Sequence, residues 1–504
     1  MNFDYTRLQG NNLSLAWFKL GIISLGFAGL YSVVLVMLRT PQLASFFPNP
    51  HIFKSALIIH VDLSVLIWLL SITASVWSLS FSQPSMSFPR KRESSIFFLD
   101  SRFRGNDIMC KLSFLATLLI AISPIAGHNP VMNNYIPMLE NIIFVLGLSL
   151  FGITLLLYAI NILYLFDWAN WSGLINFTIL STIIMFILTW VCFWCSYGDL
   201  QNVIQIIPIE IEFYYELLFW SGGHLLQFIY TQIAMFIWGM LFEKLIGKES
   251  KFQKFYLFLL YLNFVFSTLI IWGHISYDII DGNFKEFYTN HMKYLGGIAP
   301  ILCIGGIGLE WVCHSRESGN PEKKIYWIPA SAGMTASIIK STLLCSITLF
   351  LLGGLIAMNI SGINVVIPAH YHGSIVGISI ACMGYCYLGI SVIPAKAGIH
   401  KIVKKKSFLK TFLDSRLRGN DIKNMMTTAL YHLTFGQILH ILGLAFAGGY
   451  GVMRKDPNTV MPLSAKLLMG MMGGGGLIAI MAGLMFVYIC GKTIFLKNKQ
   501  NYDD

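Results

Sequence analysis

Long apolar stretches recur along the whole chain, and they constrain its fold more than any other feature. A helix that crosses the hydrocarbon core of a bilayer needs about 20 mostly apolar residues. Charged residues make up 12% of the 504-residue chain, about half of the roughly 25% that is typical of soluble domains. We therefore predict an all-α integral membrane protein, with twelve transmembrane helices in a single domain. The predicted spans are 14–38, 53–81, 113–127, 137–163, 173–195, 213–243, 255–274, 291–313, 338–358, 363–390, 430–452 and 465–490.

The net charge of +11 does not indicate a nucleic-acid partner, because three segments between predicted spans account for all of it. Segment 82–112 has six basic residues against three acidic ones, 314–337 has three against two, and 391–424 has nine against two. Leu99–Ile108 recurs almost unchanged as Leu413–Ile422. The segments resemble translated bacterial repeat elements, inserted as basic cytoplasmic loops where insertions are tolerated. A partner-binding surface built from the three loops is the alternative.

The distribution of basic residues predicts the orientation in the membrane. The three basic segments follow the second, eighth and tenth predicted spans, and loop 244–254 after the sixth span contains four lysines. Loop 196–212, after the fifth span, contains neither Lys nor Arg. Because positively charged loops stay in the cytoplasm, we expect both termini to be cytoplasmic. The N-terminus runs directly into the first span, so we expect no cleavable signal peptide.

Two histidines lie two residues apart in Ala369-His370-Tyr371-His372, near the outer end of the tenth predicted span. Each residue of an α-helix advances by about 100°, so residues two apart differ by about 200° and point to opposite sides. One helix can therefore provide a ligand to each of two metal centres. Ionisable and metal-binding side chains inside a bilayer are rare and indicate a functional site. Two polar residues that face water at a helix mouth are the alternative.

Histidines from five predicted spans lie at one depth, in the outer half of the bilayer, by the rise of about 1.5 Å per residue. Imidazole binds transition metals and haem iron through a neutral nitrogen. Gly222, Gly223 and Gly273 precede two of these histidines, and small residues let a helix or a flat macrocycle approach the backbone. A buried structural role is the alternative for each histidine alone, but the common depth favours metal binding. The six are His60, His224, His274, His370, His372 and His440.

This pattern resembles subunit I of haem–copper oxidases, a family of twelve-span membrane proteins. The resemblance covers nearly the whole chain outside the three basic segments. His60 matches the family's low-spin haem ligand in the second span, and Ala369-His370-Tyr371-His372 matches the family's Ala-His-aromatic-His motif. The resemblance implies a low-spin haem between His60 and His372 and a high-spin haem on His370.

The eleventh predicted span carries a second point of resemblance. His440-Ile441-Leu442-Gly443-Leu444 is similar to the family's His-x-x-Gly-Leu motif. In the family a basic pair that holds the haem propionates follows this motif. Arg454 and Lys455 would supply that pair here, at a longer spacing. A basic anchor at the membrane interface is the alternative.

The copper site of the family is matched only in part. His224, after Gly223, matches the residue that supplies one copper ligand. His274 matches the first of two adjacent histidines that supply the others, but Ile275 stands in place of the second. Two imidazoles alone are a poor ligand set for copper. Leu226 and Phe228 stand where the family has a glutamate and a tyrosine, and these departures argue against proton pumping.

The resemblance implies a terminal oxidase subunit of a bacterial inner membrane. It would receive electrons from cytochrome c or a quinol, pass them between two haems, and reduce oxygen to water beside copper. Its catalytic residues would be His224, His274 and His370, and its partners the lipid bilayer and other oxidase subunits. A nitric-oxide-reductase-like subunit is one alternative. A degenerate haem-binding membrane protein without turnover is another.

Overall fold

The structure, a computed structural model, is almost entirely helical, and it describes residues 11–38, 51–81, 94–318, 330–360, 362, 364–390, 419–452 and 462–500. Twelve helical stretches in these ranges are long and apolar enough to cross a membrane. Each of them overlaps one predicted span, so the predicted fold class is confirmed. The stretches are Asn12–Leu38, His51–Ser80, Asn106–Ala126, Ile142–Tyr164, Leu174–Ile204, Ile211–Ile246, Gln253–Ser276, Gly282–His314, Ala336–Ala357, Val366–Gly389, Asp421–Gly449 and Leu463–Ile494.

Three spans contain two α-helices each. The second consists of α4 (His51–Val61), the π-helical turn η1 (Asp62–Ile67) and α5 (Trp68–Trp77). The seventh joins α10 (Gln253–Thr268) to α11 (Ile271–Ser276), and the eighth joins α12 (Gly282–Leu295) to α13 (Ile298–Ser318). The other long helices are α2 (Asn12–Leu38), α6 (Ser94–Ile122), α7 (Ile142–Tyr164), α8 (Leu174–Ile204), α9 (Ile211–Ile246), α14 (Ala330–Ala357), α15 (Val366–Ile390), α17 (Gly419–Gly449) and α18 (Leu463–Gln500).

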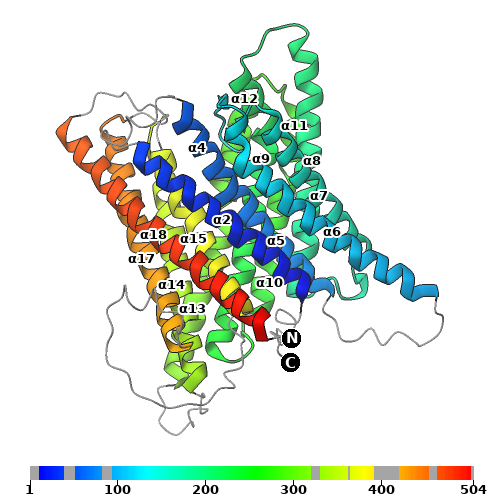
Figure 1. Cartoon of the computed structure of the whole chain (residues 1–504), viewed down its shortest axis with the longest axis vertical. Helices are drawn as coiled ribbons and strands as arrows, with labels where there is room; N and C mark the ends of the chain where they lie inside the picture. The colour runs from blue at the N-terminus through cyan, green and yellow to red at the C-terminus, as the bar shows by residue number, and fades with distance from the viewer. Residues whose placement is uncertain are drawn as a thin grey trace.

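Helix α9 lies at the centre of the bundle. It contacts α8, α10, α12, α13, α14 and α15, and most of its length is buried. The helix ends at Gly247, which adopts the left-handed conformation (φ 69°) and returns its N–H to the Glu243 carbonyl, a common way to end a helix. In Figure 1, α2 and α18 cross in front of the bundle, and they contact each other. The central position of α9 places His224 in the interior.

Close contact between backbones sets the position of α15. A Cβ atom at Gly373 would lie 2.4 Å from Gly353 Cα on α14, and one at Gly353 would lie 2.3 Å from the Ser374 backbone nitrogen. Only glycine permits this approach, in the manner of small-residue interfaces in membranes. The contact fixes the first turns of α15, which carry His370 and His372, against α14.

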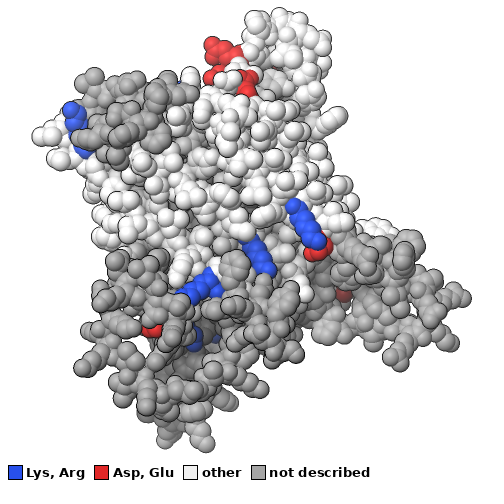
Figure 2. All heavy atoms as spheres, viewed as in Figure 1, with Lys and Arg blue, Asp and Glu red and all other residues white. Residues whose placement is uncertain are grey.

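Both ends of the described chain lie at the same end of the bundle (Figure 1), as expected for an even number of spans. On the face shown in Figure 2, a band across the middle of the described surface shows no charged side chains. Most of the basic side chains visible on this face lie below that band, and acidic ones gather at its upper tip. This distribution suits a protein whose middle faces lipid.

The three basic segments fall partly outside the described residues. Helix α6 begins at Ser94, so it includes the second half of segment 82–112. Helix α13 ends at Ser318 and α14 begins at Ala330, both inside 314–337. Helix α17 begins at Gly419, inside 391–424. Helices therefore extend into all three segments, while their origin as insertions remains a prediction.

A short β-hairpin connects the third and fourth spans. Strands β1 (Pro130–Val131) and β2 (Met138–Leu139) pair antiparallel, with Pro130 opposite Leu139 and Val131 opposite Met138. At the tip, Asn133 Oδ1 accepts hydrogen bonds from the backbone N–H groups of Tyr135 (3.0 Å) and Ile136 (2.9 Å). Strand β1 contacts both α4 and α9. The tip of this Tyr135 hairpin (residues 130–139) is thereby held against α9.

Candidate functional site

His60 lies on the second span, two residues before the π-helical turn η1. Its Nδ1 atom lies 3.0 Å from the Ala28 carbonyl oxygen and 2.8 Å from Ser32 Oγ, both on α2. Because a carbonyl oxygen only accepts, the ring proton belongs on Nδ1 and the lone pair on Nε2. No described residue makes a hydrogen bond to Nε2 of His60. Metal-ligating histidines characteristically donate their other ring N–H to a carbonyl in this way.

His370 repeats this arrangement on α15. Its Nδ1 atom lies 2.9 Å from the Gly353 carbonyl oxygen of α14 and 3.3 Å from Ser374 Oγ. The close glycine contact between α14 and α15 makes this carbonyl accessible. No hydrogen bond from a described residue reaches Nε2 of His370. The ring is half-buried and presents a lone pair on Nε2.

His372 contacts a different helix from His370. Its ring lies 4.4 Å from the His440 ring between centroids, at an interplanar angle of 63°. His440, on α17, donates from Nδ1 to the Met472 carbonyl of α18 at 2.9 Å. His370 contacts α14 and His372 contacts α17, so the two side chains of the motif reach different neighbours, as their spacing predicts.

One hydrogen bond fixes the second span relative to α15. Trp68 Nε1 donates to Ser379 Oγ at 3.2 Å. His60 precedes Trp68 by eight residues, and His372 precedes Ser379 by seven. At 1.5 Å per residue, both histidines lie roughly 10 to 12 Å along their helices from this contact. The two helices run in the same direction, so His60 and His372 reach a similar level.

His224 is buried on α9 (3% exposed), and both of its ring nitrogens are engaged. Nδ1 lies 2.7 Å from the Trp220 carbonyl oxygen, so this nitrogen carries the proton. Nε2 lies 2.8 Å from the hydroxyl oxygen of Tyr135, so the phenol donates to the remaining lone pair. The lone pair that would bind a metal is therefore used by a protein side chain.

His274 lies near His224 but is engaged differently. Its Nε2 atom lies 3.0 Å from Ser221 Oγ, and its Nδ1 lies 4.0 Å from Asp199 Oδ2. The Tyr288 ring contacts both histidine rings, at centroid distances of 5.9 Å to His224 and 6.0 Å to His274. Ile275, at the position of the missing third ligand, is 71% exposed and directed away from this cluster.

Aromatic rings fill the space beside the three glycines that flank these histidines. A Cβ at Gly223 would lie 2.2 Å from Tyr135 Cγ, and one at Gly222 would lie 2.3 Å from the Phe193 ring. A Cβ at Gly273 would lie 2.5 Å from the Tyr288 ring. The sequence predicted that these glycines would admit a helix or a flat macrocycle. The rings that use this space belong to the protein itself.

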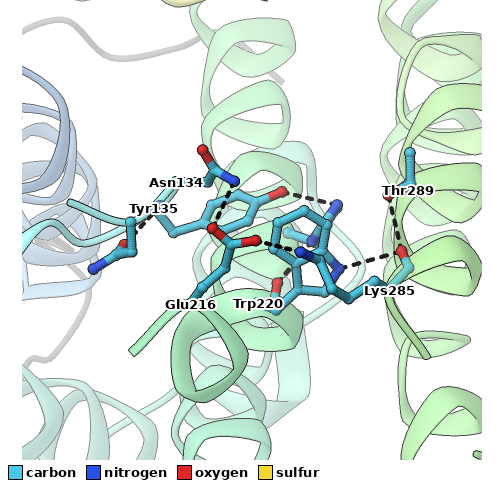
Figure 3. Close-up of polar contacts among 8 residues, drawn as sticks. Asn134, Tyr135, Glu216, Trp220, Lys285 and Thr289 are labelled. Atoms are coloured by element: carbon cyan, nitrogen blue, oxygen red, sulfur yellow. Dashed lines mark hydrogen bonds and ion pairs between the residues drawn. The ribbon is translucent and has the colours of Figure 1, made fainter. Parts of the chain in front are cut away.

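An ion pair lies near the N-terminal end of α9, about two turns before His224. Glu216 pairs with Lys285 of α12 and accepts a hydrogen bond from Asn134 Nδ2 at 3.1 Å (Figure 3). The Lys285 ammonium group lies 4.5 Å from the centre of the Trp220 ring, and Trp220 Nε1 donates to the Lys285 carbonyl at 3.3 Å. These contacts connect the tip of the Tyr135 hairpin to α9 and α12.

The predicted propionate-binding residues and one further histidine, His291, remain to be located. Arg454 and Lys455, predicted to hold propionates, lie outside the described residues. His291 donates from Nε2 to the Phe266 carbonyl at 2.8 Å and packs against Phe228 and Phe287. Within the described ranges, no group of three or more His, Cys, Asp or Glu side chains is placed to hold a single metal ion.

Sequence reasoning missed the residues that decide what each histidine can bind. The partners of His60 and His370 include the main-chain carbonyls of Ala28 and Gly353, which no side-chain pattern reveals. Tyr135 lies 89 residues before its partner His224. The Asn133–Asn134 pair predicts a turn at this point, but nothing in the local sequence indicates its contact with His224.

Comparison with solved structures identifies the fold. A cryo-EM structure of a haem–copper terminal oxidase dimer matches with a TM-score of 0.61 at 14% identity, over 97% of this chain and 83% of the other. The twelve-span architecture is therefore that of a haem–copper terminal oxidase. No protein-family model matches the chain.

Comparison with curated sequences identifies the family. Uncharacterized protein RP382 of Rickettsia prowazekii is 64% identical over 509 aligned residues, which cover 97% of both chains. An uncharacterized protein of Aquifex aeolicus is 25% identical over 383 residues, 74% of this chain and 83% of that protein. The chain belongs to the same family as the Rickettsia prowazekii protein.

Proposed function

We propose that this protein is a haem-binding oxidoreductase of a bacterial inner membrane, built on the terminal oxidase fold. A low-spin haem would lie between His60 and His372, and a second haem would bind His370. The observation that carries the proposal is the shared pattern at His60 and His370. In each, Nδ1 donates to a carbonyl of a neighbouring helix and leaves the Nε2 lone pair available.

Haem supplies one-electron chemistry when bound, and the residues of this chain supply ligation and orientation. The carbonyls of Ala28 and Gly353 fix the rings of His60 and His370 and raise their basicity as ligands. The glycine contact between α14 and α15 sets the distance from His370 to its carbonyl partner. Arg454 and Lys455 would hold the propionates.

The reaction would use electrons from cytochrome c or a quinol, delivered with the help of other oxidase subunits, to reduce a small molecule. Oxygen is the substrate that the fold favours. A second candidate is a haem protein that transfers electrons without reducing oxygen. The engagement of both nitrogens of His224 supports this candidate, because a second metal would need one of them.

A haem count on the purified protein tests the proposal. We expect two haems per chain by pyridine haemochrome assay, and a carbon monoxide shift in the reduced spectrum. His60→Ala should remove the low-spin haem and keep the other. His432→Ala is the matched control, because this histidine is exposed on α17 and, among the described residues, hydrogen-bonded only to the carbonyl one turn before it. A folded wild-type protein without haem would refute the function.

A further inference from the structure

We infer that Tyr135 takes the place of the second metal, so that His224 and His274 form a closed aromatic cluster without a metal ion. This inference rests on the proposed function for its haem sites, and it departs from the metal pair that the oxidase fold implies. It rests on the lone pairs that His224 and His274 leave available and on the side chains that fill the space around these two rings.

The first observation is the hydrogen bonding of His224. With Nδ1 donating to the Trp220 carbonyl, Nε2 is the one nitrogen with a lone pair, and the Tyr135 hydroxyl binds it at 2.8 Å. A metal–imidazole bond of about 2.0 Å would have to displace that phenol. The Tyr135 ring also lies close to the imidazole, tilted by 47° at a centroid distance of 4.8 Å. The ligand position on His224 is thus occupied by Tyr135.

The second observation is the packing behind that ring. Tyr135 approaches α9 where Gly223 has no side chain, and even a methyl group there would lie 2.2 Å from Tyr135 Cγ. The ring is therefore fitted to a gap in the helix surface rather than resting over the histidine by chance. Tyr288 fills the equivalent gap at Gly273, between the two histidines.

The third observation is the anchoring of the Tyr135 hairpin. Asn133 orders its tip through two backbone N–H groups, and the adjacent Asn134 bonds to Glu216, which pairs with Lys285 (Figure 3). These contacts restrain the backbone that carries Tyr135, so a metal could not displace the phenol by an easy movement of the hairpin. Hydrogen bond, packing and anchoring all keep the phenol in place.

A fourth observation concerns the missing ligand. Ile275 occupies the position where the oxidase pattern has a third histidine, and its side chain is 71% exposed. Its neighbour His274 uses Nε2 toward Ser221 at 3.0 Å. Among the described residues, no group of three His, Cys, Asp or Glu side chains is placed to hold a metal ion in compensation for the loss of the His224 lone pair.

Metal analysis tests the inference on full-length protein in detergent, loaded in turn with Cu(I), Fe(II) and Zn(II) and then desalted. We expect clearly less than one non-haem metal ion per chain, and the same content in His224→Ala. One copper, iron or zinc ion per chain that is lost in His224→Ala would overturn the inference. Metal that survives His224→Ala would bind elsewhere and support it.

Tyr135 variants test the assignment to this residue. Tyr135→Ala should take up severalfold more copper than the wild type, because it removes both the hydroxyl and the ring. Tyr135→Phe should lie between the two, because it frees the lone pair on Nε2 of His224 while its ring still fills the gap at Gly223. Equal uptake by Tyr135→Ala and the wild type would show that another feature excludes the metal, and would overturn the role of Tyr135.

The haem content of the same samples separates the two proposals. Haem without non-haem metal supports both of them. A folded protein without haem refutes the proposed function. In that case the metal content still tests whether Tyr135 excludes a metal ion from His224. Monodisperse elution and the helical circular dichroism signal identify samples that are folded.

Discussion

Two sets of histidines in this bundle, His60 with His370 (the first cluster) and His224 with His274 (the second cluster), differ in what surrounds the ring. In the first cluster, His60 and His370 each donate from Nδ1 to a carbonyl of a neighbouring helix. In the second, the Nδ1 partner of His224 belongs to its own helix, and a tyrosine from a separate hairpin takes Nε2. The first arrangement leaves a ligand position available, and the second fills it.

This difference shows that a histidine motif alone does not define a metal site. The decisive properties are the position of the ring proton and the identity of the group that faces the lone pair. Both depend on residues remote in sequence. A chain can therefore keep Gly223-His224 of the oxidase pattern while using the imidazole for packing and hydrogen bonding.

The largest expected effect separates the two clusters directly. His370→Ala should abolish the carbon monoxide response and remove one haem, because it deletes the ligand that we propose for that haem. His224→Ala should keep both haems and the response, because its lone pair serves Tyr135. Optical spectra of the two variants, recorded on membranes prepared in the same way, provide the measurement. Loss of the response in His224→Ala, with haem content intact, would show that the two clusters form one centre.

The next effect concerns the helix contact behind His370. Gly353→Ala places a methyl group 2.3 Å from the Ser374 backbone nitrogen, so α14 must move away from α15 and carry the Gly353 carbonyl from His370. We expect substantial loss of the second haem, and destabilisation of about 1 to 3 kcal/mol from overpacking. Gly354→Ala is the matched control, because a Cβ there meets nothing within 4 Å. Equal haem retention in both variants would contradict the role of this contact.

The corresponding glycine-to-alanine change in the second cluster should leave the haem content unchanged. Gly223→Ala pushes a methyl group into the Tyr135 ring, whereas Gly239→Ala on the same helix meets open space. We expect the first to lower stability by about 1 to 3 kcal/mol relative to the second. Thermal unfolding in detergent measures the difference, and haem content should match in the two variants. Haem loss in Gly223→Ala alone would mean that the hairpin supports the haem sites.

Much of this architecture follows from local sequence properties. Span length and apolar content predicted all twelve spans, because lipid imposes the same demand on each of them. The angular separation of His370 and His372 followed from helix geometry. Local sequence did not predict that His60 leaves a lone pair available while His224 does not, because this difference depends on main-chain carbonyls and on Tyr135. These contacts join elements far apart in the chain, and helix packing brings them together.

A smaller effect is expected at the hydrogen bond from α2 to the second span. Ser32→Ala removes one of two partners of His60 Nδ1 and leaves the Ala28 carbonyl in place. Loss of the hydrogen-bond partner of a ligating histidine typically lowers affinity by about 10- to 100-fold. Because the Ala28 carbonyl remains, we expect haem affinity to fall by no more than about 10-fold here. Haem transfer to apomyoglobin measures the change. Ser64→Ala, which removes a bond to the His60 main chain only, serves as the control.

The smallest effect belongs to the anchor of the Tyr135 hairpin. Glu216→Gln removes the charge that faces Lys285 but keeps an oxygen for Asn134. The two side chains are 20% and 32% exposed, and partly exposed ion pairs contribute about 0 to 1 kcal/mol after solvent screening. We therefore expect a shift of that size in unfolding free energy, and less of it at high salt. Uptake of Cu(I) should remain at the wild-type level, because the hydroxyl of Tyr135 and its fit at Gly223 persist without the charge. Uptake near that of Tyr135→Ala would instead make the ion pair the main restraint on the hairpin.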